Sequence, residues 1–67
     1  MEDHMKFLCA EINQYIGFDD PEVVELKDGI YYFRDNGVCH SAYFTGDEMV
    51  AFLKGILWGL HLHNDLV

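Results

Sequence analysis

Apolar and polar residues recur with a helical period in the first part of the chain. Between residues 4 and 17, apolar side chains return every three or four positions, with polar side chains between them and Gly17 at the end. This spacing places apolar side chains on one face of an α-helix, and glycine often follows the last helical residue. The pattern predicts an amphipathic helix over about residues 4–17, with an apolar face of Met5, Leu8, Ile12, Tyr15 and Ile16.

The middle of the chain carries two signals for tight β-hairpins, Asp28-Gly29 and Asn36-Gly37. Both dipeptides supply the positive backbone φ angles that a two-residue turn of type I′ requires. An acidic turn before them could also begin a helix, but the two hairpins favour a strand at that point. The sequence therefore predicts three antiparallel strands, over about residues 22–27, 30–35 and 38–44.

Two-residue turns also predict the register of these strands. Val24 should lie opposite Phe33, and Phe33 opposite His40. Because side chains alternate along a strand, every second residue shares a face. The expected core face contains Val24, Leu26, Tyr31, Phe33, Val38, His40, Ala42 and Phe44. The other face is mixed, with charged residues beside Tyr32 and Tyr43, so it can face water or a partner.

A second helix is predicted over about residues 46–63. It begins at a capping box, Thr45-Gly46-Asp47-Glu48, in which the Thr45 hydroxyl accepts from the Glu48 amide and the Glu48 carboxylate from the Thr45 amide. This helix is apolar around most of its circumference, so it needs cover on two sides: the sheet on one, and the first helix or a second subunit on the other. Its sheet-facing stripe should contain Met49, Val50, Leu53, Ile56, Leu57 and Leu60.

These elements predict an α+β fold, with an N-terminal helix, a three-stranded antiparallel meander and a C-terminal helix packed on one sheet face. The chain is expected to form a single domain over residues 1–67. So small a domain buries only about 60% of the surface of its unfolded chain, and oligomerisation is a common source of added stability. Gly55, Trp58, Gly59 and Leu62 form a flat apolar strip that could make a homodimer.

Net charge decides which partners can approach. Twelve acidic residues against four basic ones give a formal charge of −8, which should repel nucleic acid and anionic membranes. We therefore expect neither direct nucleic-acid binding nor membrane binding. Acidic residues gather in the predicted turn and hairpins, at Asp19, Asp20, Glu22, Glu25, Asp28 and Asp35. They are either solubilising turn formers or an acidic edge that binds a basic surface on another protein.

Tyr32 and Tyr43 are the aromatic candidates on the outer sheet face. Stacking on nucleic-acid bases would need a basic groove beside them, and only Lys27 and Arg34 are basic there. The two tyrosines are therefore interpreted as an interaction patch, a dimer surface or ordinary exposed aromatics.

Histidines and cysteines are numerous enough for a zinc site, at His4, Cys9, Cys39, His40, His61 and His63. Their spacing argues against one, because Cys39 and His40 point to opposite faces of a strand and neither CxxC nor HxxxH occurs. The same geometry disfavours a Cys39-His40 catalytic pair, and no glycine-rich phosphate loop is present. We expect no metal, no cofactor and no enzymatic activity. Two isolated cysteines and an acidic amino terminus further favour a cytoplasmic protein.

Residues 45–55, which follow a strand ending in Ala42-Tyr43-Phe44, resemble part of many small bacteriophage proteins with a hairpin, a capped turn and a closing helix. Small acidic phage proteins of this kind are often inhibitors of host enzymes, including anti-CRISPR and anti-restriction proteins. The resemblance covers about the last 25 residues, implies an inhibitor in the host cytoplasm and assigns no role to single residues.

The leading hypothesis is a non-enzymatic binding protein whose acidic hairpin edge occupies a basic surface of a host nucleic-acid-processing protein. One alternative is a homodimeric assembly subunit that uses the apolar C-terminal helix. Another is a metal-binding domain.

Overall fold

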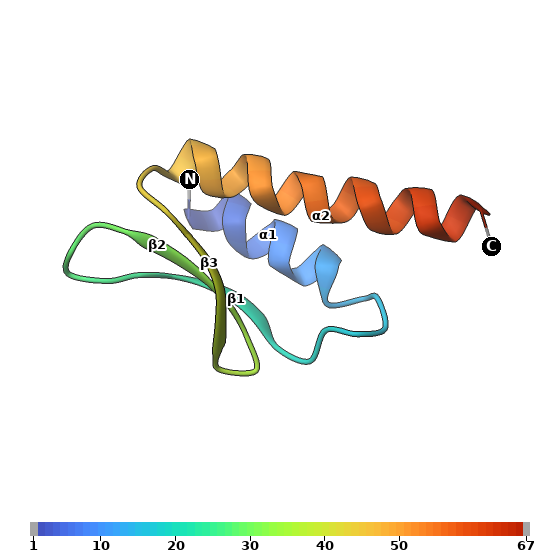
Figure 1. Cartoon of the computed structure of the whole chain (residues 1–67), viewed down its shortest axis with the longest axis horizontal. Helices are drawn as coiled ribbons and strands as arrows, with labels where there is room; N and C mark the ends of the chain where they lie inside the picture. Colours follow the sequence, from blue (N-terminus) through green and yellow to red (C-terminus); the bar gives the residue numbers. More distant parts are fainter. Residues whose placement is uncertain (1, 67) are drawn as a thin grey trace.

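The computed structural model describes residues 2–66, and its elements follow the order helix, three strands, helix. Helix α1 (Glu2–Ile12) is followed by strands β1 (Pro21–Glu25), β2 (Tyr31–Asp35) and β3 (Val38–Tyr43), and then by helix α2 (Gly46–Leu66). The strands form one antiparallel sheet in the order β1-β2-β3. Both helices lie on one side of this sheet (Figure 1). The predicted α+β fold is confirmed.

Helix α1 ends at Ile12, earlier than the expected residue 17. Beyond it the backbone tightens, because the Tyr15 amide donates to the Ile12 carbonyl at 3.1 Å, three residues back. Gly17 then adopts a φ of 110°, which reverses the chain. This turn leaves Ile16 exposed and brings Phe18 back onto the core. The early end of the helix thus lets Phe18 pack against the core, where it is partly buried.

The first hairpin has a longer loop than predicted. The Gly29 amide donates to the Leu26 carbonyl at 2.9 Å, and Gly29 has a φ of 80°. A turn closed by a left-handed glycine makes a three-residue loop, which the same Asp-Gly signal also fits. The strand register consequently moves by one residue, and Val23 rather than Val24 lies opposite Phe33. The predicted register of the first strand pair is wrong for this reason.

The second hairpin has the predicted turn but a different register farther along. Asn36 and Gly37 have φ angles of 54° and 80°, as a type I′ turn requires. A β-bulge beside Phe33 then adds one residue to β3, so that Ser41 rather than His40 lies opposite Phe33. An extra residue on one strand moves every later residue of that strand to the other face.

The two register shifts change which apolar residues face the helices. Tyr43 packs against the core, with its ring centroid 5.3 Å from that of Phe52. By contrast Leu26, Val38 and Phe44, all expected in the core, are exposed. The core-face prediction is also wrong for Val24 and Ala42, which lie opposite Tyr32 on the other face, and for His40, which is exposed. Val24, Leu26, Ala42 and Phe44 are misplaced because alternation was counted from the wrong register. Val38 keeps its predicted position opposite Asp35 and is exposed beside the turn.

The hydrophobic core lies between the two helices and the central strand. The Phe33 side chain is its contribution from β2, and its ring stands edge-on to that of Phe52 at 5.4 Å. The buried apolar residues are Met5, Leu8, Cys9, Ile12, Phe33, Met49 and Leu53. Val50, Ile56 and Leu57 pack against them, as the predicted stripe of the second helix requires.

The amino-terminal end of α2 is capped by side chains. The Thr45 hydroxyl accepts from the Glu48 amide at 3.2 Å, which confirms half of the predicted capping box. In the other half, the Glu48 carboxylate accepts from the Thr45 hydroxyl at 3.0 Å instead of from the Thr45 amide. Two acidic residues in the first turn, Asp47 and Glu48, also favour this end of the helix through its dipole.

Candidate functional site

Strand β1 is an edge of the sheet and gathers most of the predicted acidic residues. Five of the six lie in it or directly beside it in the chain: Asp19, Asp20, Glu22, Glu25 and Asp28. The sixth, Asp35, ends β2 opposite Pro21, the first residue of β1. The structure therefore brings the predicted carboxylates to one edge, although half of them also hold the fold together.

Asp35 is one of the carboxylates with a structural task. Its Oδ1 atom accepts from the backbone amides of Asp19 at 3.0 Å and Asp20 at 2.9 Å. These two bonds tie the segment before β1 to the end of β2. A change at Asp35 will therefore alter the edge as well as its charge.

The side chains of Asp28 and Glu22 also accept hydrogen bonds within the protein. Asp28 accepts from the Ile30 amide through Oδ1 and from the Tyr32 hydroxyl through Oδ2, each at 2.9 Å. The hydrogen bond to Asp28 raises the pKa of the Tyr32 phenol above its usual value. Glu22 Oε1 accepts from Arg34 Nη2 at 2.8 Å, which is the one ion pair among the side chains that the structure describes.

The remaining carboxylates, Asp19, Asp20 and Glu25, are exposed. These three side chains accept no hydrogen bond from the side chains and backbone that the structure describes, and only the backbone amides of Asp19 and Asp20 take part in the contacts with Asp35. Binding a partner through these three side chains would break no hydrogen bond or ion pair of the described residues.

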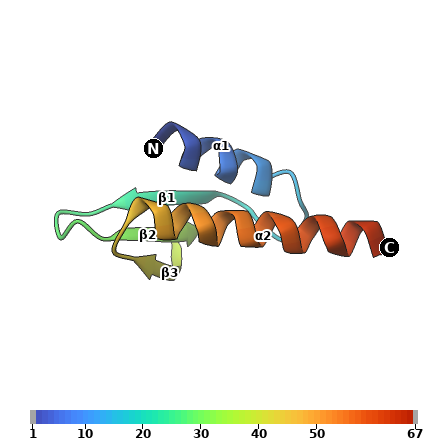
Figure 2. The ribbon, with the colours of Figure 1, turned by 90° about the horizontal axis from the view of Figure 1, so that it is seen from above.

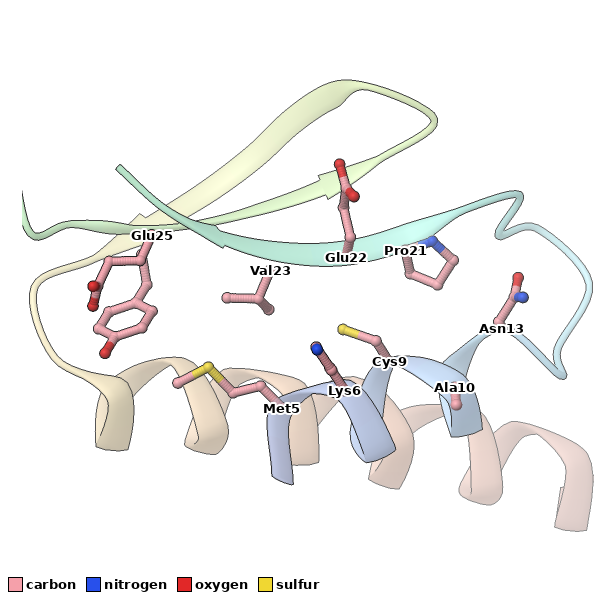
Figure 3. Close-up of a pocket in the computed structure, with 10 residues that line it drawn as sticks. Met5, Lys6, Cys9, Ala10, Asn13, Pro21, Glu22, Val23 and Glu25 are labelled. Atoms are coloured by element: carbon pink, nitrogen blue, oxygen red, sulfur yellow. The ribbon is translucent and has the colours of Figure 1, made fainter. Parts of the chain in front are cut away.

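A groove of about 430 Å³ lies between α1 and β1, beside the same edge (Figure 3). Met5 and Cys9 point into it from α1, and Val23 points toward them from β1. Lys6 of α1 also lines it. Burial, with a smaller effect of the Glu22 charge, raises the pKa of the Cys9 thiol to about 11. The sequence pattern missed this groove because it placed Val24, not Val23, on the helix side of the sheet.

Tyr32 and Tyr43 do not form one patch. Tyr32 lies opposite Ala42, whereas Tyr43 lies opposite Tyr31 on the face that carries Phe33. The prediction that the two tyrosines share the outer face is wrong, because the bulge in β3 turns Tyr43 toward the helices. Tyr32 stays on the face that no helix covers (Figure 1).

The predicted apolar strip on α2 is exposed. Gly55, Trp58, Gly59 and Leu62 follow the spacing of one helical face, and Trp58 and Leu62 are 68% and 57% exposed. A Cβ atom added at either glycine would meet no atom within 4 Å. The carboxyl-terminal part of α2 extends past the end of α1 (Figure 1), so a second helix could approach this part of α2.

The candidate metal ligands are not assembled in the part of the chain that the structure describes. There, no group of three histidine, cysteine or acidic side chains could hold one ion, and the side chain of His63 lies outside that part. Cys9 is buried and Cys39 is exposed, both as free thiols. Neither α1 nor α2 is long and apolar enough to cross a membrane within residues 2–66.

Comparisons with protein-family models, with curated proteins and with solved structures found no match to this chain. Function must therefore be inferred from its own charge and geometry. The features that bear on it are the acidic edge of β1, the groove beneath α1 and the apolar strip on α2.

Proposed function

We propose that this protein acts by binding, without catalysis, and that the acidic edge at β1 engages a basic surface of another protein. The observation that carries this proposal is the charge of residues 19–28, which hold five carboxylates and one lysine. Only Glu22 among these carboxylates has a cationic partner in the described structure. A concentrated and largely uncompensated charge speeds encounter with a basic partner and excludes acidic ones.

The partner we propose is a protein that itself handles nucleic acid. If residues 19–28 were fully extended at about 3.3 Å per residue, their five carboxylates would lie on average about 7 Å apart, and because β1 covers only Pro21–Glu25 this is an upper limit on their spacing. Phosphates follow one strand of DNA at about 3.4 Å along the axis, so the edge carries roughly half that charge density. Such an edge could occupy a groove built for phosphates and compete with nucleic acid there. A phage inhibitor of the kind implied by the resemblance would act in this way.

Removing the unengaged charges should weaken this binding without harming the fold. In the variant Asp19→Asn/Asp20→Asn/Glu25→Gln, capture of the partner from a bacterial lysate should weaken at least about tenfold, equivalent to about 1.4 kcal/mol. Wild-type capture should also fall steeply in molar salt, where the Debye length shrinks to about 3 Å. The captured protein should lose its own binding to DNA when the wild-type chain is present.

The matched control removes three charges from the helices instead, as Asp3→Asn/Glu11→Gln/Asp47→Asn. It removes the same number of negative charges but leaves β1 intact, so capture should stay close to wild type. Equal losses in the two variants would mean that overall charge matters and the edge does not. Capture that persists in molar salt would contradict the proposal.

A second candidate function, a homodimeric assembly subunit, is supported by the exposed strip of Gly55, Trp58, Gly59 and Leu62 on α2. An exposed tryptophan beside two open glycines lets another helix approach closely. If this strip forms a dimer, sedimentation velocity from low to high micromolar concentration should show a dimer that Trp58→Glu converts to monomer. A wild-type monomer throughout this range would remove the candidate, and Phe7→Glu, at another exposed aromatic on α1, is the control.

A further inference from the structure

The two helices, side by side, are wider than the three-stranded sheet that they cover. At the backbone, α2 approaches β2 and β3 but not β1, whereas α1 approaches β1 but neither β2 nor β3. Packed helices lie about 8–10 Å apart and neighbouring strands about 4.8 Å apart, so two helices span about four strands. Figure 2 shows α1 on the side of β1 away from β2, which is where a fourth strand would lie.

On the edge of β1 away from β2, main-chain groups face that position and bond to no other group in the part of the chain that the structure describes. The Leu26 amide bonds to the Ile30 carbonyl and the Asn36 amide to the Asp20 carbonyl, and hydrogen-bonded pairs alternate along an antiparallel ladder. The amides and carbonyls of Val23 and Glu25 therefore point away from β2.

Pro21 supports this assignment. It has no amide hydrogen and belongs to the same alternating set as Val23 and Glu25, opposite Asp35 in the ladder. A proline fits an edge strand only where its nitrogen faces away from the neighbouring strand. Two outward amides and three outward carbonyls are thus available on β1 for another strand.

The space beside this edge is the groove between α1 and β1, whose 430 Å³ lies within the range of about 300–1,000 Å³ usual for binding sites. Apolar groups of Met5, Cys9 and Val23 line it (Figure 3). A strand added to β1 would place every second side chain here, under α1, and the intervening side chains on the open face of the sheet.

Charge selects the segment that fits. Residues 19–28 carry five carboxylates and one lysine, so side chains of the added strand that face outward should be basic. Lys6, Glu22 and Glu25 are the charged residues that line the groove, and their sum is also negative. Side chains that face inward should be apolar, because they meet Met5 and Val23.

A second copy of this chain does not suit the position. Two β1 edges could pair about a two-fold axis, but each α1 lies on that side of its own β1 (Figure 2), so the two α1 helices would meet near the axis, whereas packed helices need about 8–10 Å between their axes. Two chains of charge −8 would also meet at their most acidic edges.

We propose that an extended segment of a partner protein, with alternating apolar and basic residues, adds to β1 as a fourth strand in the groove beneath α1. This inference rests on the proposed function for the basic character of the partner, while the geometry of strand addition stands without it.

The first test uses two short peptides of equal composition, one with alternating valine and lysine and one with these residues in separate blocks. The reporter is alkylation of Cys9 in a Cys39→Ser variant, because Cys9 lines the groove and Cys39 is exposed elsewhere. The alternating peptide should slow alkylation in proportion to its occupancy, and the block peptide should not. Equal protection by both peptides, or none by either, overturns the proposal.

The second test methylates backbone nitrogens of the alternating peptide, so it leaves the protein unchanged. In an antiparallel strand the valine amides would face β1 and the lysine amides would face away. Methylation at valine should then weaken binding at least about tenfold, and methylation at lysine should have little effect. The reverse pattern would mean a parallel added strand and would also support strand addition. Equal effects at both sets overturn it.

The third test changes the edge itself. Val23→Pro removes an outward amide without breaking a bond to β2, so peptide binding should weaken about tenfold while the thermal midpoint stays close to that of Val23→Thr. Val23→Thr keeps the amide and the branched side chain and should bind nearly as wild type. If the peptide binds Val23→Pro as well as wild type, the proposal of strand addition to β1 is overturned. The proposed role of the acidic edge is then decided by its own test.

Salt and sedimentation separate this inference from the proposed function. If molar salt has no effect while the two peptides are still distinguished, the acidic role fails and strand addition stands. If the alternating and the block peptide bind equally well at low salt, strand addition fails and charge attraction stands. A wild-type dimer that Val23→Pro converts to monomer would make a second copy the occupant and overturn the proposal.

Discussion

Replacing Phe33 with alanine is expected to unfold most of the protein at room temperature. The Phe33 side chain is 2% exposed and packs against Phe52, and it is the buried residue that the sheet contributes to the core. Removal of such a ring costs about 3–5 kcal/mol. A core this small rarely supplies more than about 3–5 kcal/mol in total, so little stability would remain. Loss of the cooperative transition in urea, followed by far-ultraviolet circular dichroism, measures this effect.

Phe44→Ala is the matched control for this experiment. Alternation along the sequence assigned Phe33 and Phe44 to the same core face, but Phe44 is 78% exposed in the structure. Its replacement should change the free energy of unfolding by no more than about 0.5 kcal/mol. Similar losses from the two substitutions would mean that the bulge in β3 is absent and that the predicted register holds.

Asp35→Ala is expected to lower the free energy of unfolding by about 2 kcal/mol. The carboxylate accepts from two backbone amides, those of Asp19 and Asp20, and bonds to charged groups contribute about 1.5–3 kcal/mol each where they are well buried. Asp35 is only partly buried, which reduces the combined effect. Chemical denaturation at neutral pH measures the change, and a shift below about 0.5 kcal/mol would contradict the structural role.

Two variants separate the hydrogen bonds of Asp35 from its charge. Asp35→Asn removes the charge but keeps a side-chain oxygen that can accept, so it should recover part of the stability that Asp35→Ala loses. Asp19→Ala removes a carboxylate at the other end of the same contact but keeps the backbone amide that donates to Asp35. It should be close to neutral.

Some carboxylates of the acidic edge make internal hydrogen bonds and others do not, and this difference decides which substitutions can test binding. Charge reversal at Asp28 or Asp35 would remove hydrogen bonds that shape the β1–β2 loop and the entry to β1. Loss of binding in such variants could not be assigned to charge. Asp19, Asp20 and Glu25 give a cleaner test because their side chains make no hydrogen bond in the described structure.

The acidic edge and the groove beneath α1 involve the same strand. Glu22 lies on the open face of the sheet with Arg34, and Val23 points under α1. A segment that binds along β1 would therefore contact both the negative charges and the apolar floor. Charge would determine how fast a partner arrives, and main-chain pairing with apolar contacts would determine how long it stays.

The sequence by itself determined the types of the elements, their order and the net charge. Local interactions set these features: Asn36-Gly37 closes its turn through the backbone angles of two neighbouring residues, and Thr45 and Glu48 cap α2 within one helical turn. The acidic composition of residues 19–28 is likewise a property of the chain alone. Such signals are short in range, so they can be recognised without knowledge of what packs against them.

Only the tertiary structure decided the strand register, the faces of the sheet and hence the groove. Side chains alternate with a period of two, so one extra residue in the loop before Ile30 and one in β3 exchanged the positions of Val23 and Val24 and of Ala42 and Tyr43. Neither extra residue has a distinct local signal. The longer loop and the bulge are favoured because they bring Val23 and Tyr43 to the side of the sheet on which α1 and α2 bury Phe33. The free energy gained by packing these side chains depends on residues far apart in the chain.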